Sequence, residues 1–386
     1  MKFRVERDAL ADAVTWAARS LSTRPTMPVL AGLLLTISSD KMSVSGFDLE
    51  ASTEVDLDVS TGEDGQALVS GRLLADITKA LPPHPVDVHV DGSRLSIVCG
   101  AARFTLPTMP VEDYPRLPSM PTTAGTVTSA QFATAVGQVA IAAGRDDTLP
   151  MLTGVRLEID GTRLTLAATD RYRLAVRELD WTPEDPSADA AQVLVPARTL
   201  ADAAKSLSHS DSMTLALAAG GAGEGIIGFA GTTNGRASRA TTRLLDATFP
   251  AYRSLLPNEW SSSADITVAP LVEAVRRVAL VADRNTPVRL EFEDGALTLS
   301  AGGEDEGRAE EVLEVGYDGD PITTAFNPQF LLDGLGALTS PTARLLFTSA
   351  NKPVVLRPSE SGSPDHAGGA AADDYTYVMM PVRLPG

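Results

Sequence analysis

The chain has 386 residues, and its 32 Lys and Arg residues against 50 Asp and Glu residues give a formal net charge of −18. This balance argues against a protein that coats nucleic acid with its whole surface, although it allows a local basic surface. Cys99 is the only cysteine, which excludes an intrachain disulfide framework and a metal site built from cysteines. No uncharged run approaches the roughly 18 apolar residues of a membrane-spanning helix, and the N-terminus lacks the apolar run of a signal peptide. We therefore expect a soluble, cytoplasmic protein.

The first third of the chain predicts two helices among β-strands. Asp8 occupies the position of an N-cap for a helix that continues to about Arg19. A second helix is expected from Gly71 to Leu81, because the two prolines that follow cannot continue it. Apolar and β-branched runs predict strands at 33–37, 42–47, 54–59, 86–90, 94–99 and 103–106, with Asp91-Gly92 as a hairpin turn.

The remaining two thirds predict the same order of elements. Helices are expected at 129–143, 198–207, 270–282 and 328–338. Strands are expected at 154–159, 164–168, 172–179, 213–218 and 226–230, with hairpin turns at Asp160-Gly161 and Asp294-Gly295. Residues 358–374, rich in Ser, Gly, Ala, Asp and Pro, interrupt the last hairpin and favour a surface loop. Such a loop is either a tolerated insertion or a segment that binds a partner.

These elements form a threefold internal repeat. The first helix of each copy has its apolar positions at Leu10/Ala13/Val14, Phe132/Ala135/Val136 and Leu271/Ala274/Val275. The second helix repeats a Leu/Asp/Leu motif at Leu74/Asp76/Leu81, Leu200/Asp202/Leu207 and Leu331/Asp333/Leu338. A period of this length is a whole domain rather than a solenoid unit. We expect an α+β fold of three repeated domains, each with two helices on antiparallel sheets, at 1–121, 122–257 and 258–386.

Motifs of catalysis and metal binding are not evident in the sequence. The four His residues form no zinc motif, and Ser208-His209-Ser210-Asp211 has the composition of a turn rather than of a triad assembled from separate elements. The Gly-rich run 220–225 lies between two predicted strands and lacks the lysine of a phosphate loop. The acidic residues 304–306 are typical of a solvated edge. We expect no catalytic residue, no metal and no cofactor. Two alternative functions remain open. One is a hydrolase or transferase with a composite site between domains, and the other is a scaffold that does not bind DNA.

Basic residues gather on or beside the repeated helices, while acidic residues crowd the strands and loops. The residues concerned are Arg7, Arg19, Arg24, Arg72, Lys79, Arg198, Lys205, Arg276 and Arg277. Two explanations stay open, a shared basic surface and ordinary charge on helix surfaces.

Five segments resemble the beta subunit of bacterial DNA polymerase III, the sliding clamp. They are Met1-Lys2-Phe3, residues 24–30 (RPTMPVL), 168–175 (ATDRYRLA), 249–257 (FPAYRSLLP) and 377–384 (YVMMPVRL). The resemblance covers essentially the whole chain, and the acidic, Ala-rich composition is similar to that of actinobacterial members. It implies a non-enzymatic processivity factor, a head-to-tail homodimer that closes a ring around duplex DNA, and short linear peptides of the polymerase, the clamp loader and repair polymerases as partners.

The resemblance also implies site residues. Contacts to DNA would come from Arg24, Arg72, Arg198 and Lys205, and the dimer interface would bring Phe104 and Leu106 to Ala279 and Leu280. The peptide-binding groove would comprise Leu152, Thr169, Arg171, Tyr172, Arg173, Leu174, Pro250, Leu255, Pro353, Val378, Met380, Pro381, Val382 and Arg383. Leu152, Leu174 and Val378 are equally well explained as core residues. Pro150-Met151 stands where some members of the family have a tyrosine pair, which leaves DNA contacts of the 144–151 loop open.

Overall fold

The computed structural model describes residues 1–22, 24–217, 225–233, 235–257, 259–282, 286–303, 307–359 and 375–383. The acidic residues 304–306 and nearly all of the Gly-rich run and of the 358–374 insertion lie outside these ranges. Pro358 and Ser359 belong to a strand rather than to the insertion.

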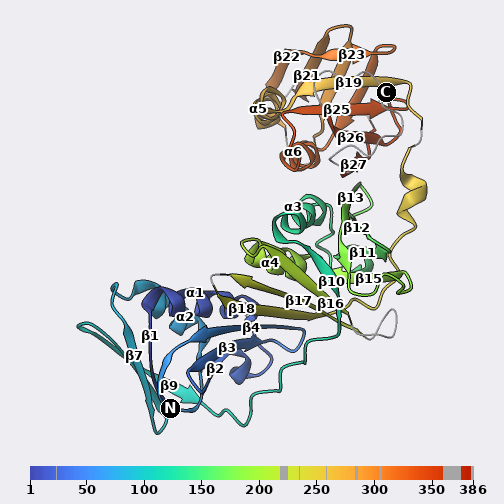
Figure 1. Cartoon of the computed structure of the whole chain (residues 1–386). Helices are drawn as coiled ribbons and strands as arrows, with labels where there is room; N and C mark the ends of the chain where they lie inside the picture. Colours follow the sequence, from blue (N-terminus) through green and yellow to red (C-terminus); the bar gives the residue numbers. More distant parts are fainter. Residues whose placement is uncertain are drawn as a thin grey trace. The chain divides into compact units, whose positions relative to one another are not determined.

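Each repeat has the same order of elements, namely a strand, a helix, five strands, a helix and three strands (Figure 1). The first contains β1 (Lys2–Val5), α1 (Arg7–Ala17), β2 (Gly32–Ser38), β3 (Lys41–Phe47), β4 (Ala51–Asp58), β5 (Ser60–Glu63), β6 (Gly65–Ser70), α2 (Gly71–Ala80), β7 (Val86–Asp91), β8 (Arg94–Cys99) and β9 (Ala102–Met109). The short 3₁₀ helices η1 (Ala18–Ser20) and η2 (Pro28–Ala31) follow α1.

The second repeat contains β10 (Thr123–Thr128), α3 (Ser129–Ala140), β11 (Gly154–Asp160), β12 (Arg163–Thr169), β13 (Arg173–Asp180), β14 (Thr182–Pro183), β15 (Ala191–Pro196), α4 (Ala197–Leu207), β16 (Ser212–Leu217), β17 (Ile226–Thr233) and β18 (Arg236–Arg243), with η3 (Pro150–Leu152) before β11 and η4 (Tyr252–Leu255) after β18. The third contains β19 (Ser262–Thr267), α5 (Val268–Val278), η5 (Ala279–Val281), β20 (Val288–Glu293), β21 (Ala296–Gly303), β22 (Gly307–Glu314), β23 (Gly316–Asp318), β24 (Ile322–Phe326), α6 (Pro328–Gly336), β25 (Thr342–Phe347), β26 (Val354–Ser359) and β27 (Tyr375–Met379).

The chain divides into two compact units that cut across the central repeat. Unit 1 comprises Met1–Ala133 and Asp180–Asp246, and unit 2 comprises Thr134–Leu179 and Ala247–Gly386. Unit 1 holds one sheet in the order β14-β10-β16-β17-β18-β4-β3-β2-β6-β9-β8-β7-β1-β5. In unit 2 one sheet runs β11-β12-β13-β27-β26-β25-β19-β23 and another runs β22-β21-β20-β24. The central repeat is divided because each of its halves pairs with a neighbouring repeat.

Two antiparallel strand pairings join the repeats. In unit 1, β18 pairs with β4, and a 2.7 Å hydrogen bond between the hydroxyls of Ser52 and Thr241 links the two strands. In unit 2, β27 pairs with β13 over five residue pairs, from Arg173 opposite Met379 to Arg177 opposite Tyr375. Both pairings join the last strand of one repeat to the fourth strand of the repeat before it.

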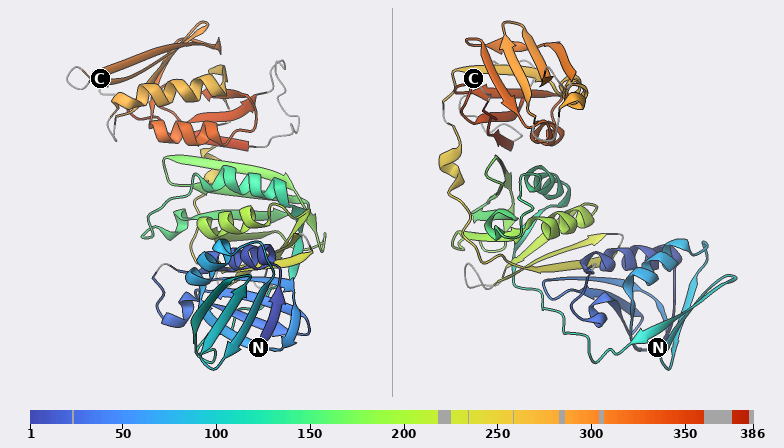
Figure 2. Two further views of the ribbon diagram at one scale, coloured as in Figure 1. Left: turned by 90° about the vertical axis from the view of Figure 1, so that its left-hand side faces the viewer. Right: turned by 180° about the vertical axis from the view of Figure 1, so that it is seen from behind.

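The helices bury the apolar face that the sequence predicts. Leu10, Ala13 and Val14 of α1 are at most 2% exposed, and the matching residues of α3 and α5 are at most 1% exposed. Burying each of the larger side chains in this set, such as Leu, Val and Phe, stabilises the fold by roughly 1.5–3 kcal/mol. Helices α1 and α2 contact each other in unit 1, as do α5 and α6 in unit 2, and Figure 2 shows each pair side by side. The predicted α+β architecture is confirmed.

Some predicted boundaries are wrong, for local reasons. Helix α1 begins at Arg7 with Glu6 as its N-cap residue, which places Asp8 in the first turn, where it forms a 2.9 Å ion pair with Arg7. The first hairpin turn is Gly92-Ser93 rather than Asp91-Gly92, because Asp91 still pairs with Arg94. Gly92 has φ +56, a left-handed conformation that glycine adopts without strain. The second hairpin is shifted in the same way, since Asp160 pairs with Arg163.

Candidate nucleic-acid and partner interfaces

The four cations expected to contact DNA are exposed and have no counter-ion among the described residues. Arg24 follows η1, Arg72 is on α2, and Arg198 and Lys205 are on α4. None of the four forms an ion pair in the part of the chain that the structure describes. Strand cations behave differently, since Arg239 pairs with Asp56 at 2.7 Å and Arg344 with Asp265 at 2.8 Å. The charge of these four cations is therefore available to an external anion.

Helix α5 does not share this property, so of the two open explanations ordinary charge on a helix surface fits α5 better. Arg276 pairs with Glu273 at 2.9 Å, and Arg277 donates to Glu311 of β22 from two nitrogens. The hydrogen bond from Arg277 lowers the pKa of the Glu311 carboxyl. Arg7 is likewise paired with Asp8. The unpaired helix cations therefore belong to unit 1.

A tight turn in unit 2 presents the first part of the expected peptide groove. The Asp170 carboxylate accepts hydrogen bonds at 3.0 Å from the backbone N–H groups of Tyr172 and Arg173, and the Thr169 hydroxyl donates to the Arg173 carbonyl at 2.6 Å. Arg171 has φ +80, which is uncommon for a residue other than glycine. The turn leaves Arg171 and Tyr172 exposed.

Arg173 is engaged in contacts inside unit 2. Its guanidinium donates to Asp170 at 2.9 Å and to Asp333 of α6 at 2.5 Å, and it lies 4.4 Å from the ring centroid of Phe330. Burial acts to lower the pKa of Arg173, but Tyr377, Asp333 and Asp170 outweigh it, so the pKa is raised. The Arg173 side chain is only 8% exposed, and its contact with a peptide stays a prediction.

The other expected groove residues all lie in unit 2 but differ in exposure. The buried ones are Leu152, Thr169, Leu174 and Val378, at 3–6% exposure, and their contact with a peptide stays a prediction. The half-buried ones are Pro250, Pro353 and Pro381, and the exposed ones are Arg171, Tyr172, Leu255, Met380, Val382 and Arg383. The Met380 N–H donates to the Tyr172 carbonyl at 2.8 Å, so the last strand and the turn meet. The ring of Tyr172 stacks on Phe330, a neighbour that the sequence analysis missed.

The expected dimer residues separate into exposed and buried ones. Leu280 after α5 is 83% exposed, Phe104 of β9 is 36% exposed, and Ala279 is half-buried. Leu106 is 1% exposed and packs in the core of its own repeat, and its part in the interface stays a prediction. Val312 of β22 is also an apolar residue, 61% exposed, and the sequence analysis did not name it as a candidate interface residue. The sequence analysis predicted no strand there, because the strand follows directly after the acidic residues and mostly alternates exposed and half-buried residues.

Comparison with known proteins decides the family. The N-terminal, central and C-terminal domains of the DNA polymerase III beta subunit match residues 1–118, 126–251 and 253–383. The beta sliding clamp of Streptomyces coelicolor is 57% identical over 387 residues and covers all of both chains. That of Micrococcus luteus is 50% identical over 311 residues, which is 81% of this chain and 98% of the relative. The chain belongs to the beta sliding clamp family.

Solved structures of the beta sliding clamp family agree with this assignment. The clamp of Pseudomonas aeruginosa, solved bound to griselimycin, is 28% identical and superposes with a TM-score of 0.87 over all of both chains. The predicted resemblance, including its actinobacterial character, is confirmed. The chain is thus a DNA sliding clamp, which encircles duplex DNA and tethers the replicative polymerase.

Neither a membrane helix nor a metal cluster occurs in this clamp within the described ranges. No helix there is long and apolar enough to cross a membrane. No three His, Cys, Asp or Glu side chains gather there as ligands of one metal ion would.

Proposed function

We propose that two copies of this chain close a ring head to tail by pairing β9 of one copy with β22 of the other. The supporting observation is the order of strands. The fourth strand of each repeat is β4, β13 or β22, and the last strand is β9, β18 or β27. The chain itself pairs β18 with β4 and β27 with β13. A third pairing of the same kind would join β9 to β22, and it requires a second copy.

Both strands have an edge available for this pairing. Strand β9 pairs with β8 along Ala102–Pro107 but meets β6 only at Thr108 and Met109. Strand β22 is the terminal strand of its sheet in the described part of the chain. Exposed edges of this kind favour addition of another strand. The exposed apolar side chains of Phe104, Leu280 and Val312 would lose water on the same contact, which adds a hydrophobic contribution.

We propose that Arg24, Arg72, Arg198 and Lys205 attract the phosphates of the enclosed duplex. Their charges are unpaired in unit 1, whereas many strand cations are neutralised by nearby carboxylates. An acidic body disfavours nonspecific binding elsewhere on the surface. Because a closed ring retains DNA topologically, these contacts need not be strong, and binding should be independent of sequence.

The exposed part of the expected groove would bind short peptides of the polymerase, the clamp loader and repair polymerases. Four large apolar side chains of this region are exposed, namely Tyr172 at 57%, Leu255 at 53%, Met380 at 43% and Val382 at 38%. Exposed apolar clusters commonly mark protein contacts, and Met adapts to different partners. A relative that binds griselimycin supports a ligand-binding surface on clamps of this fold. We further propose a protein without catalytic activity of its own, acting in the cytoplasm.

Loading on circular DNA tests the ring. The protein is loaded onto a nicked circle with a clamp loader, isolated by gel filtration, and the DNA is then linearised. We expect co-elution with the circle and release after linearisation, because a ring slides off free ends. Retention on the linear DNA would contradict topological binding.

Removing residues 380–386 tests the groove. We expect loss of polymerase binding while sedimentation still shows the dimer. Leu255→Ala, which removes one exposed apolar side chain, should weaken the same binding without abolishing it. Unchanged polymerase binding by the truncated protein would refute the groove.

A further inference from the structure

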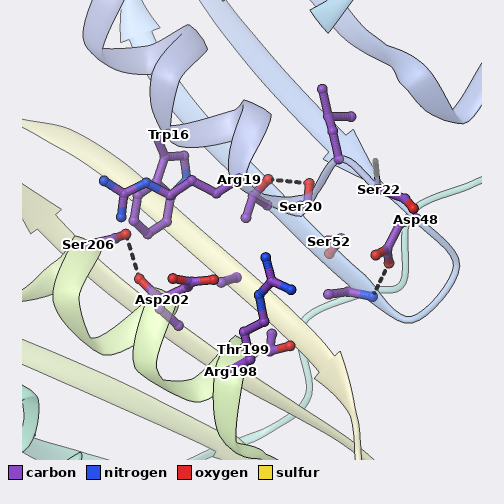
Figure 3. A pocket seen from close by; sticks show the side chains of 15 residues that line it. Trp16, Arg19, Ser20, Ser22, Asp48, Ser52, Arg198, Thr199, Asp202 and Ser206 are labelled. Atoms are coloured by element: carbon purple, nitrogen blue, oxygen red, sulfur yellow. Dashed lines mark hydrogen bonds between the residues drawn. The ribbon is translucent and has the colours of Figure 1, made fainter. Parts of the chain in front are cut away.

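A pocket of about 270 Å³ lies between α1 and α4 in unit 1 (Figure 3). We call it the α1–α4 pocket and define it by Trp16, Arg19, Ser52, Arg198, Asp202 and Ser206, which are among the residues that line it. Strand β4 contributes Ser52 to its wall. The proposed DNA-binding cation Arg198 is therefore also a pocket residue.

The pocket contains positively and negatively charged side chains that could bind a ligand. Arg198 and Arg19 form no ion pair in the described part of the chain, and the same holds for the Asp202 carboxylate one helical turn after Arg198. Figure 3 shows Arg198 and Asp202 projecting from α4 into the space below α1. The other pocket carboxylate, Asp48, is already occupied, because it accepts from the backbone N–H groups of Glu50 and Ala51 at 3.0 and 2.7 Å.

The pocket also contains an aromatic ring, and two of its hydroxyl groups are already hydrogen-bonded within the chain. The Arg19 guanidinium lies 6.0 Å from the ring centroid of Trp16, whose buried indole N–H has no hydrogen-bond partner among the described residues. The hydroxyl of Ser52 is paired with Thr241, and that of Ser206 with the Asp202 carbonyl. The charged groups that remain for a ligand are two planar guanidinium groups and one carboxylate, beside the Trp16 indole N–H and the Thr199 hydroxyl.

We propose that the α1–α4 pocket binds an unpaired nucleotide whose base carries an amino group. The phosphate would be bound by Arg198 and Arg19, since guanidinium groups match phosphate oxygens in geometry and charge. The base would stack on a guanidinium plane, as unstacked bases commonly do. Asp202 would accept a hydrogen bond from the base amino group, which cytosine has and thymine lacks. A simple phosphate ion would be repelled by the Asp202 carboxylate. The presence of both arginines and a carboxylate therefore favours a nucleotide over a simple anion.

This inference deepens the proposed binding of DNA and rests on it. The nucleotide has two sources, a free monophosphate or one residue of single-stranded DNA near a primer end. The loading experiment above measures topological retention of the ring and does not measure nucleotide binding in the pocket. A ring that loads and slides but binds no nucleotide would therefore refute this inference alone.

Calorimetric titration of the full-length dimer with dCMP, dTMP, and ten-residue oligomers of each tests the pocket. We expect tighter binding of the cytosine ligand than of the thymine ligand. Arg198→Ala should weaken binding of both about tenfold, the effect of losing one charge-assisted hydrogen bond. Asp202→Asn should abolish the preference for cytosine. Binding of the oligomers only would assign the pocket to single strands, and binding of the monophosphates only would assign it to free nucleotides.

The repeat supplies a matched control. Arg72 and Asp76 occupy in α2 the positions that Arg198 and Asp202 occupy in α4, and they do not line the α1–α4 pocket. Asp76→Asn, which changes no proposed DNA-binding cation, should leave both affinity and base preference unchanged. The inference is overturned if no nucleotide binds at millimolar concentration, or if the α2 and α4 variants behave alike while circular dichroism shows all of them folded.

Discussion

At the scale of single residues, the turn at 169–173 shows strain at an exposed position. Arg171 has φ +80, and only its neighbours hold it there, through the hydrogen bonds of Thr169 and Asp170. Left-handed backbone costs a side-chain-bearing residue of the order of 1 kcal/mol or more. A protein keeps such a residue when the side chain has a use, and here the side chain lies at the proposed groove.

We predict that Arg171→Gly stabilises the fold and weakens peptide binding. Glycine adopts this conformation without strain, so the free energy of unfolding should rise by about 0.5–1 kcal/mol. Thermal melting and peptide titration measure the two effects. Arg171→Lys, which keeps the charge and the strain, is the control and should not change the melting midpoint. A destabilised Arg171→Gly protein would show that the turn depends on the arginine side chain.

Gly334 of α6 marks a close approach of helix and sheet. A Cβ atom there would lie 2.5 Å from Cε1 of Tyr377 and 3.0 Å from Cδ2 of Leu356. We predict that Gly334→Ala lowers the free energy of unfolding by about 1–3 kcal/mol, because overpacking outweighs the helix propensity of alanine. Gly336→Ala is the matched control, since a Cβ there meets no atom within 4 Å. Equal melting midpoints for the two variants would contradict this account.

At the scale of elements, the same position in three helices has acquired different roles. Asp76 of α2 and Asp202 of α4 are exposed, whereas Asp333 of α6 is half-buried and binds Arg173. Removing one partner of a buried ion pair leaves the other charge uncompensated. The contact joins α6 to the turn before β13, so its loss should affect the groove as well.

We predict that Asp333→Ala lowers the free energy of unfolding by about 2–4 kcal/mol. Asp76→Ala and Asp202→Ala should change it by less than about 0.5 kcal/mol, as at most exposed surface positions. Thermal melting of the three variants provides the comparison. An effect of the same size in all three would show that the position matters for helix stability and not for the ion pair.

At the scale of the whole molecule, the chain leaves unmade one of three equivalent strand pairings. Heterologous contacts either close a ring or propagate as a filament. Three repeats per chain, with β9 and β22 as the free edges, fit closure by two copies. The apolar residues on these edges are the natural place to test assembly.

We predict that Leu280→Glu and Val312→Glu shift the protein from dimer to monomer without lowering its melting midpoint. Both side chains are exposed in the single chain, so a charge costs little until the edges meet. Sedimentation should show the 40.4 kDa chain as a monomer for the variants and as a dimer for the parent. Trp260→Glu, at a 48% exposed position on neither edge, is the control and should remain a dimer. Dimeric variants would place the contact elsewhere.

The repeat, the main helices and the family follow from the sequence alone, whereas strands such as β6, β10 and β18 were not predicted. Apolar residues such as Leu10 and Val14 recur at helical spacing, and periodicity is local information that needs no tertiary contact. Hairpin turns were predicted within one residue, since a glycine marks the turn but pairing of Asp91 with Arg94 decides its register. The four DNA-binding cations were also chosen from the sequence, and their contact with DNA stays a prediction.

Only the tertiary structure decided which of these residues are available. Arg173 and Arg171 are two residues apart, yet one is buried in ion pairs and the other is exposed, because Asp333 approaches from α6, 160 residues away. Arg277 and Arg198 look alike in the sequence, but Glu311 neutralises the first and no described carboxylate pairs with the second. Leu106 and Phe104 share a strand and differ in burial. Burial and ion pairing depend on neighbours distant in the chain, so residue type and spacing cannot reveal them.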